Sequence, residues 1–305
     1  MALVEAWGRG VPHDPITHRW FRDKVLLDAN FDPDGLRVAV RGDEIVGAAY
    51  GVRRRVPMVG VDLEPAQGWI PFFFVVPEAR RAGLGRRLVT DVLDRLRELG
   101  RTRVDFSSYT PHYLLPGLDE ETYPEAAGLL GSLGFRTLHE VAAMDRTLVG
   151  YRMPDAVLRR SVELVGLGYR FGTPSDDDLV DLLRLAAEEF GADWAGAVRR
   201  SLAAGMPVER IVAVRAPEGD LVGWAMHGAY DGIDERFGPF GVHAGQRGTG
   251  LGQVLLHLTL GRMRALGLHG AWFLWTGEDS PAGRLYRGAG FATTRTFRVL
   301  RREDA

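Results

Sequence analysis

The chain has 305 residues, a length that predicts about two domains, each long enough to bury its own core. Its net charge of −2 arises from 38 basic and 40 acidic residues without a long basic run, which argues against nucleic acid or an anionic membrane as the main partner. The absence of cysteine excludes disulfides and thiolate chemistry, and the lack of a signal-peptide pattern or of an apolar run near ~20 residues predicts a cytoplasmic protein.

The first half of the chain is predicted to begin with helices and to continue with strands. A central strand runs through a glycine turn, Arg80-Arg-Ala-Gly83-Leu-Gly85, into a helix whose apolar residues recur at helical spacing and which ends at Gly100. In chain order the predicted elements are two helices within 7–32, strands at 36–40, 45–50 and 69–76, the helix after Gly85, a strand at 104–106, a long excursion at 109–119, a helix at 123–131 and a strand from 135 to about 148.

The second half repeats this order after a helical connector at 151–168. Its predicted elements are a strand from 169, helices at 179–190 and 192–204, strands at 211–214 and 221–228, a strand ending near 242, a helix to 266, a strand at 271–275, a helix at 281–287 and a last strand from 291. Each half therefore predicts an α/β sandwich on a mixed sheet. We expect domains at 1–150 and 169–305, joined by the connector.

The glycine turn of the second half, Arg247-Gly-Thr-Gly250-Leu-Gly252, is typical of an anion site. Glycines let the backbone approach a ligand closely, and the helix that follows offers unpaired N–H groups and the positive end of its dipole. The Rossmann spacing does not fit, because the third small residue is replaced by Gln253 or Leu255 in the two registers. A P-loop is excluded because Lys24, followed by valine, is the only lysine.

The same turn occurs twice at a constant offset of 167 residues, since Arg80 to Leu88 matches Arg247 to Leu255. Flanking segments repeat in the same order, with Glu44-Ile-Val-Gly47 matching Asp220-Leu-Val-Gly223 and Leu133-Gly-Phe135 matching Ala289-Gly-Phe291. Three matched landmarks in one order indicate an internal duplication.

The repeated Arg-x-x-Gly-x-Gly pattern resembles motif A of the Gcn5-related N-acetyltransferase (GNAT) family, in its tandem two-domain form. The resemblance implies two tandem domains, each a mixed, mostly antiparallel central sheet with splayed parallel strands and flanking helices. It also implies acetyl-CoA as co-substrate and a small-molecule amine as acceptor: an amino sugar, an amino-sugar-linked metabolite, an amino acid or a polyamine. The implied cofactor-binding residues are Val242, His243, Arg247, Gly248, Gly250, Leu251, Gly252, Gln253 and Asp279 in the second half and Val75, Arg80, Gly83 and Gly85 in the first.

A candidate general acid follows from the same resemblance. The segment from Ala282 to Phe291 fits the family pattern Ala-x-x-Leu-Tyr-x-x-x-Gly-Phe and makes Tyr286 the proton donor for the leaving thiolate. The alternative for Tyr286 is a helix tyrosine packed against the sheet. Leu130 stands at this position in the first half, which is therefore expected to bind CoA without the ordinary chemistry, unless Tyr109, Tyr113 or Tyr123 substitutes.

Other features leave alternatives open. The excursion at 109–119 is longer than its counterpart, which indicates a lid or, preferably, a domain-interface filler. Metal and serine-hydrolase motifs are absent, and the oligomeric state is not predicted. A non-catalytic acyl-CoA-binding module and a nucleotide-binding oxidoreductase are the competing functions. The general base is undecided among Glu188, Glu189, Asp193, His227, Asp231, Asp234, Glu235, Glu278 and Asp279.

Overall fold

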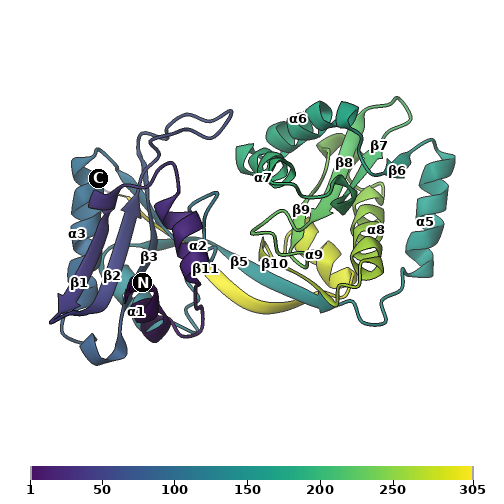
Figure 1. The fold of residues 1–305 in the computed structure, drawn as a ribbon. Helices are drawn as coiled ribbons and strands as arrows, with labels where there is room; N and C mark the ends of the chain where they lie inside the picture. The colour runs from purple at the N-terminus through teal and green to yellow at the C-terminus, as the bar shows by residue number, and fades with distance from the viewer. Residues whose placement is uncertain (1, 304–305) are drawn as a thin grey trace. The chain divides into compact units, whose positions relative to one another are not determined.

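The computed structural model describes residues 2–303 and divides into two compact units, each of which is described by itself (Figure 1). Unit 1 comprises the chain up to Pro57, Val61–Val141 and the chain from Thr296, and unit 2 comprises Met58–Gly60 and Ala142–Arg295. Among the described residues, no helix has the length and apolar character needed to cross a membrane.

Unit 1 is a sheet covered by helices on both faces. Its strand order is β1-β2-β3-β4-β11, antiparallel except for the parallel pair β3–β4. Its elements are α1 (Ala2–Gly10), α2 (His18–Phe21), a π-helical turn (Arg22–Leu26), β1 (Leu36–Arg41), β2 (Glu44–Val52), β3 (Gln67–Val75), α3 (Leu84–Glu98), β4 (Arg103–Phe106), α4 (Pro124–Ser132), and parts of β5 (Arg136–Thr147) and β11 (Ala292–Glu303).

Side chains alternate across the central strands of unit 1, as the period of two in a β-strand requires. Tyr50, Phe72 and Phe74 pack with α1 and α2 in one apolar cluster. Ala49, Phe73 and Val75, which point to the other face, pack with the apolar stripe of α3 in a second cluster. Both faces of β2 and β3 are therefore buried.

All of β4 pairs with β3, but only with the beginning of that longer strand. Gln67 to Ile70 of β3 lie opposite Arg103 to Phe106 of β4, whereas β3 continues to Val75. A register shift opposite Tyr50–Val52 marks a bulge at the point where this pairing ends. The two parallel strands thus splay apart towards their carboxyl ends.

Unit 2 has an antiparallel sheet in the order β6-β7-β8-β9, again between helices. One apolar cluster packs α5 and α8 on the sheet, and another packs α6 and α7. Its elements are α5 (Asp155–Gly166), β6 (Arg170–Gly172), α6 (Leu179–Glu189), α7 (Ala192–Ala203), β7 (Ile211–Arg215), β8 (Leu221–His227), β9 (Phe237–Val242), α8 (Leu251–Ala265), β10 (Gly270–Thr276) and α9 (Pro281–Gly288).

The splay recurs in unit 2. A single parallel bridge, Arg236 to Trp272, joins the approach to β9 with β10, and no further β9–β10 pairing occurs in the described part of the chain. The register of β9 shifts opposite Ala225–His227, as the glycine and proline content of this strand predicts. The predicted fold, with mixed sheets, splayed parallel strands and flanking helices, is confirmed.

Two long strands, β5 (teal) and β11 (yellow) in Figure 1, each contribute to both units. The end of β5 pairs with β10 in unit 2, whereas the end of β11 pairs with β4 in unit 1. The expected domains, 1–150 and 169–305, assign each strand to one domain and so differ from the compact units. Each strand has 12 residues, about twice the usual length, which lets its two halves take different partners.

Candidate functional site

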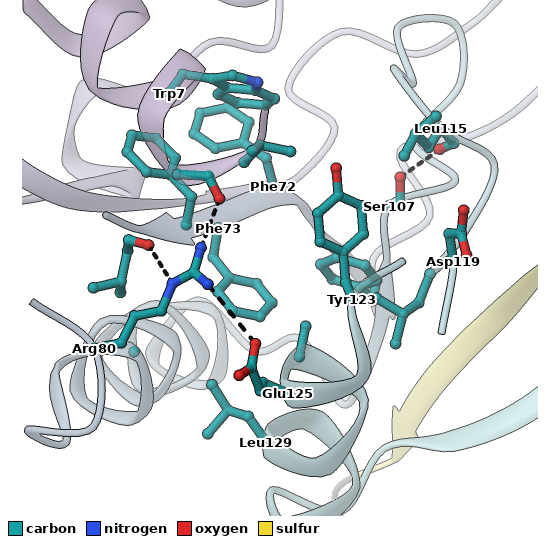
Figure 2. Close-up of a pocket in the computed structure, with 18 of the residues that line it drawn as sticks. Trp7, Phe72, Phe73, Arg80, Ser107, Leu115, Asp119, Tyr123, Glu125 and Leu129 are labelled. Atoms are coloured by element: carbon teal, nitrogen blue, oxygen red, sulfur yellow. Dashed lines mark hydrogen bonds and ion pairs between the residues drawn. The ribbon is translucent and has the colours of Figure 1, made fainter. Parts of the chain in front are cut away.

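The glycine turn of unit 1 is held at the end of β3 by an arginine. Arg80 donates from Nε to the carbonyl oxygen of Val75 at 3.0 Å and from Nη2 to that of Gly10 at 3.0 Å. Its guanidinium also lies 3.8 Å from the carboxylate of Glu125 (Figure 2). Gly83, the N-cap of α3, has a φ of 79°, a conformation that disfavours residues with a Cβ. The turn therefore presents the N-terminus of a 15-residue helix.

The turn of unit 2 has the same construction. Arg247 donates from Nε to the carbonyl oxygen of Val242 at 3.4 Å, and Gly250, the N-cap of α8, has a φ of 86°. Since α3 and α8 also begin and end 167 residues apart, the duplication seen in the sequence is a duplication of structure. Both arginines fix the shape of their turn through a backbone carbonyl.

A cavity of about 350 Å³ lies beside the turn of unit 1, within the size range of small-ligand sites. Aromatic and aliphatic side chains from α1, β3, β4 and α4 form most of its wall, and arginines stand at the turn (Figure 2). The residues that line the cavity include Trp7, Phe72, Phe73, Arg80, Arg81, Gly83, Gly85, Arg86, Phe106, Ser107, Asp119, Tyr123, Glu125 and Leu129.

The polar groups of the cavity wall are held by hydrogen bonds. Ser107 donates its hydroxyl hydrogen to the carbonyl oxygen of Leu115. Tyr123 donates to Oδ2 of Asp14, at an O–O distance of 2.7 Å. Asp119, which is buried, accepts hydrogen bonds from the backbone and hydroxyl groups of Thr122. The wall is therefore apolar with a few oriented polar groups, the usual composition of a ligand site.

The turn of unit 2 is covered by a side chain from α5. Arg160 donates from Nε and Nη2 to the carbonyl oxygen of Thr249, at 3.0 and 2.7 Å. Its Nε lies 3.0 Å from the position that a Cβ on Gly250 would take. A ligand phosphate at this turn would therefore lie beside the guanidinium of Arg160. The guanidinium would attract the phosphate electrostatically but would also occupy part of the space beside the turn.

A carboxylate from the end of α6 contacts the strand end beside the same turn. Glu189 accepts a hydrogen bond from the backbone N–H of Ala244 at 2.9 Å. Its oxygens lie 3.3 Å from Nε2 of His243 and 3.6 Å from Nη2 of Arg247. Two predicted cofactor residues of unit 2 are thus engaged by an internal anion.

Tyr286 lies on α9 and packs against aromatic side chains from both splayed strands of unit 2. Its ring centroid is 4.4 Å from that of Phe273 on β10 and 6.0 Å from that of Phe240 on β9. The residue is 8% exposed, and this burial raises the pKa of its hydroxyl above the ordinary value for tyrosine. The phenol is protonated at neutral pH, as a tyrosine with the ordinary pKa also is. Its ring is packed as the alternative interpretation of Tyr286 expects.

The remaining predicted residues of unit 2 differ in exposure. Leu251 is buried beneath the turn, and Gly252 packs near Leu285 and Phe240. Gln253 is exposed. The Asp279 side chain is 99% exposed and lies 3.6 Å from Nη2 of Arg287. Gly248 has a φ of 79° within the turn.

Some residues at these sites have no local sequence signal. Trp7, Gly10 and Val11 wall the cavity although they lie more than 60 residues before the turn. Arg160 belongs to the segment predicted as a connector. The excursion at 109–119 lines the cavity of unit 1 through Leu114, Leu115, Gly117, Leu118 and Asp119. This position fits a lid better than the domain-interface filler that the sequence favoured. Only its unusual length pointed to it.

Comparison with known proteins bears on both units. Residues 4–112 and 179–291 each match the model of the acetyltransferase (GNAT) family. The mycothiol acetyltransferase of Pseudarthrobacter chlorophenolicus is 27% identical over 279 residues, which cover 88% of this chain and 77% of that protein.

Solved structures show the same fold. A GCN5-related glucosamine N-acetyltransferase region of a fungal multi-domain GH3 β-N-acetylglucosaminidase superimposes with a TM-score of 0.79 at 17% identity, covering 98% of this chain and 36% of that longer one. A GCN5-related N-acetyltransferase from Sphaerobacter thermophilus gives 0.70 at 18% identity, covering 99% and 91% of the two chains. A tandem GNAT protein from the clavulanic acid biosynthesis pathway gives 0.65 at 17% identity, covering 98% and 94%.

Proposed function

The chain belongs to the acetyltransferase (GNAT) family, and from that premise we propose that it moves the acetyl group of acetyl-CoA to a primary amine of a small molecule by direct attack. Acetyl transfer is the family's activity. The cofactor sites, the acceptor and the catalytic groups named below are our proposal for this chain.

The observation that carries the proposal is the cavity of unit 1. It combines an apolar wall, suited to the pantetheine arm, with a helix N-terminus and the arginines 80, 81 and 86, suited to a diphosphate. The carboxyl half of β3 pairs with β2 but not with β4, and its backbone groups on the β4 side can bond the amides of the arm. We assign acetyl-CoA to this cavity, with Val75, Arg80, Gly83 and Gly85 at its diphosphate end.

We assign the transfer step to unit 2, with Tyr286 as general acid. The assignment is supported by the packing of its ring against Phe240 of β9 and Phe273 of β10, the two strands that splay apart. A phenol is protonated at neutral pH and can give this proton to a departing thiolate. In this proposal Phe240 and Phe273 move apart to admit the thioester, while the turn from Arg247 to Gly252, together with Arg160, receives the diphosphate.

For the acceptor we propose an amino sugar or an amine linked to one. The support comes from the names of two relatives, a mycothiol acetyltransferase and a glucosamine N-acetyltransferase region. Near the strand end of unit 2, the carboxylate of Glu189 offers an anionic group for a cationic amine.

A non-catalytic acyl-CoA-binding module is the second candidate. The observations that favour it are the covering of the second turn by Arg160 and the burial of Tyr286. This candidate predicts binding of acetyl-CoA without transfer.

Release of free thiol from acetyl-CoA in the presence of an amine panel tests the two candidates. The panel contains amino sugars, amino acids and polyamines, and each reaction is compared with one that lacks the amine. We expect thiol release that depends on an amine and that matches the acetylated product mole for mole. Binding of acetyl-CoA without amine-dependent release would favour the binding module.

A further inference from the structure

The last residue of α6, Glu189, has its carboxylate on the segment between β9 and α8. It accepts a hydrogen bond from the backbone N–H of Ala244 at 2.9 Å. Its oxygens also lie 3.3 Å from Nε2 of His243 and 3.6 Å from Nη2 of Arg247. Both side chains belong to the turn region to which we assign CoA. The carboxylate therefore uses donors that an anionic ligand at this turn would also use.

The position of Glu189 makes a partner for its charge necessary. The helix dipole disfavours a negative charge at the C-terminal end of α6, and the side chain is only 21% exposed. Nδ1 of His243 accepts a hydrogen bond from the backbone N–H of Gly245 at 3.1 Å, so a neutral ring has its hydrogen on Nε2, facing Glu189. If a ligand took these donors, the carboxylate would need another positive group.

The corner that follows Glu189 is fixed on the sheet. A Cβ at Gly241 of β9 would lie 2.3 Å from the ring of Phe190, which shows that this ring rests directly on the strand. Gly191, the N-cap of α7, has a φ of 119° and makes the change of direction between the two helices possible. Since the backbone is held next to Glu189, the carboxylate can change partners by rotation of its side chain, without movement of α6.

Aromatic side chains adjoin the carboxylate at the start of α7. Phe190 and Trp194 stack with ring centroids 4.9 Å apart and planes 3° apart, and both are partly exposed. The face of an aromatic ring attracts a cation such as an ammonium group. The corner of α6 and α7 therefore offers an ammonium group two kinds of favourable contact, a carboxylate and a ring face.

We propose that Glu189 exchanges partners during the reaction: acetyl-CoA displaces it from His243 and Arg247, and the released carboxylate binds the ammonium group of the acceptor. This proposal rests on the proposed function, since it requires acetyl-CoA at the turn of unit 2. The ligand's diphosphate takes the guanidinium of Arg247, and its oxygens take the N–H of Ala244. Acetyl-CoA consequently binds before the amine, and each ligand raises the affinity for the other by the same factor.

Titration of full-length protein with CoA, which has no acetyl group to transfer, tests the exchange without a reaction. All variants carry Gly85→Leu, so that the titration reports the turn of unit 2. We expect Glu189→Gln to lower the Kd for CoA about two- to fivefold, because the competing carboxylate is lost. The amine with the fastest thiol release should tighten CoA binding when Glu189 is present, and should leave it unchanged in Glu189→Gln.

Steady-state rates separate recognition of the amine from support of the turn. Glu189→Gln should raise the KM for the amine about tenfold or more, the effect of losing a hydrogen bond to a charged group, and should leave kcat within about twofold. A carboxylate that only supports the turn predicts the opposite sign for the cofactor, namely weaker CoA binding. The control is Asp177→Asn, which removes an equal charge from an exposed side chain just before α6 and should change none of these values.

The failure of this proposal differs from the failure of the proposed function. If Glu189→Gln binds CoA no more tightly, or if its KM for the amine is unchanged, the exchange does not take place. Loss of all CoA binding in the Gly85→Leu protein would also overturn it, since the turn of unit 2 would then hold no CoA. If no amine of the panel causes thiol release, the proposed function is wrong, and the exchange is wrong with it.

Discussion

A chain that ends at Arg295 should lose the cooperative unfolding transition of unit 1, because the end of β11 completes the sheet of that unit. Leu300 pairs with Phe106 of β4 and is buried in the cluster that contains α3. Phe297 and Val299 are also buried. Burial of three such side chains contributes on the order of 5 kcal/mol or more. This amount is comparable to the whole free energy of unfolding of a typical domain, about 5–15 kcal/mol.

Polar contacts add to this effect. Arg301 contacts Asp105 with two nitrogens, Nε to Oδ1 at 2.6 Å and Nη2 to Oδ2 at 2.9 Å, and Asp105 is buried. Removal of the arginine leaves a buried carboxylate without this partner, which is costly. Arg298 exchanges two backbone hydrogen bonds with Leu118 of the cavity wall.

Calorimetric unfolding of the shortened chain measures the outcome. The matched control is a chain that ends at Glu303, which retains all of β11 and should unfold as the full chain does. We expect the chain that ends at Arg295 to lose one transition and its acetyl-CoA binding in unit 1. An unfolding profile equal to that of the control would show that β11 does not support unit 1.

Replacement of Tyr286 by phenylalanine should lower kcat by about 10²-fold or more, the usual contribution of general acid catalysis. The ring and its contacts with Phe240 and Phe273 are kept, and only the hydroxyl is lost. The melting temperature and the Kd for acetyl-CoA should therefore change little. Steady-state rates with the best amine of the panel, measured beside the affinity, provide the comparison.

The control for this variant is Tyr169→Phe, which removes a hydroxyl that bonds to Gln246 at 2.6 Å at the segment before the turn. It distinguishes a proton donor from a tyrosine that supports the turn, since loss of support should appear as weaker acetyl-CoA binding. An unchanged kcat in Tyr286→Phe would leave the packing interpretation as the correct one for this residue.

The order of helices and strands was predictable because it is written in local patterns. The apolar stripe of α3, at Leu88, Val92 and Leu96, predicts one buried helix face, and Gly100, with a φ of 77°, ends the helix as expected. The duplication was also visible, because both turns need glycine at the same left-handed positions, Gly83 and Gly250.

The features that determine the site were not predictable, because they depend on distant partners. The bond from Arg160 to Thr249 spans 89 residues, and that from Tyr123 to Asp14 spans 109. The division of β11 between the units depends on β4, which lies almost 200 residues earlier. Such long-range contacts decide whether a glycine turn is open or covered. Unit 1 therefore has the described cavity, although the tyrosine that fits the family pattern lies in unit 2.

The central claim is that acetyl-CoA occupies the cavity of unit 1, with its diphosphate at the turn from Arg80 to Gly85. Calorimetric titration with acetyl-CoA tests it in two matched variants, Gly85→Leu and Gly252→Leu. A side chain at position 85 would begin 3.3 Å from Leu129 and occupy space in the cavity that Gly85 lines, whereas position 252 lies in the other turn. We predict that Gly85→Leu weakens one binding event at least tenfold and that Gly252→Leu leaves this event unchanged. A titration curve of Gly85→Leu that coincides with that of the unmodified protein would contradict the claim.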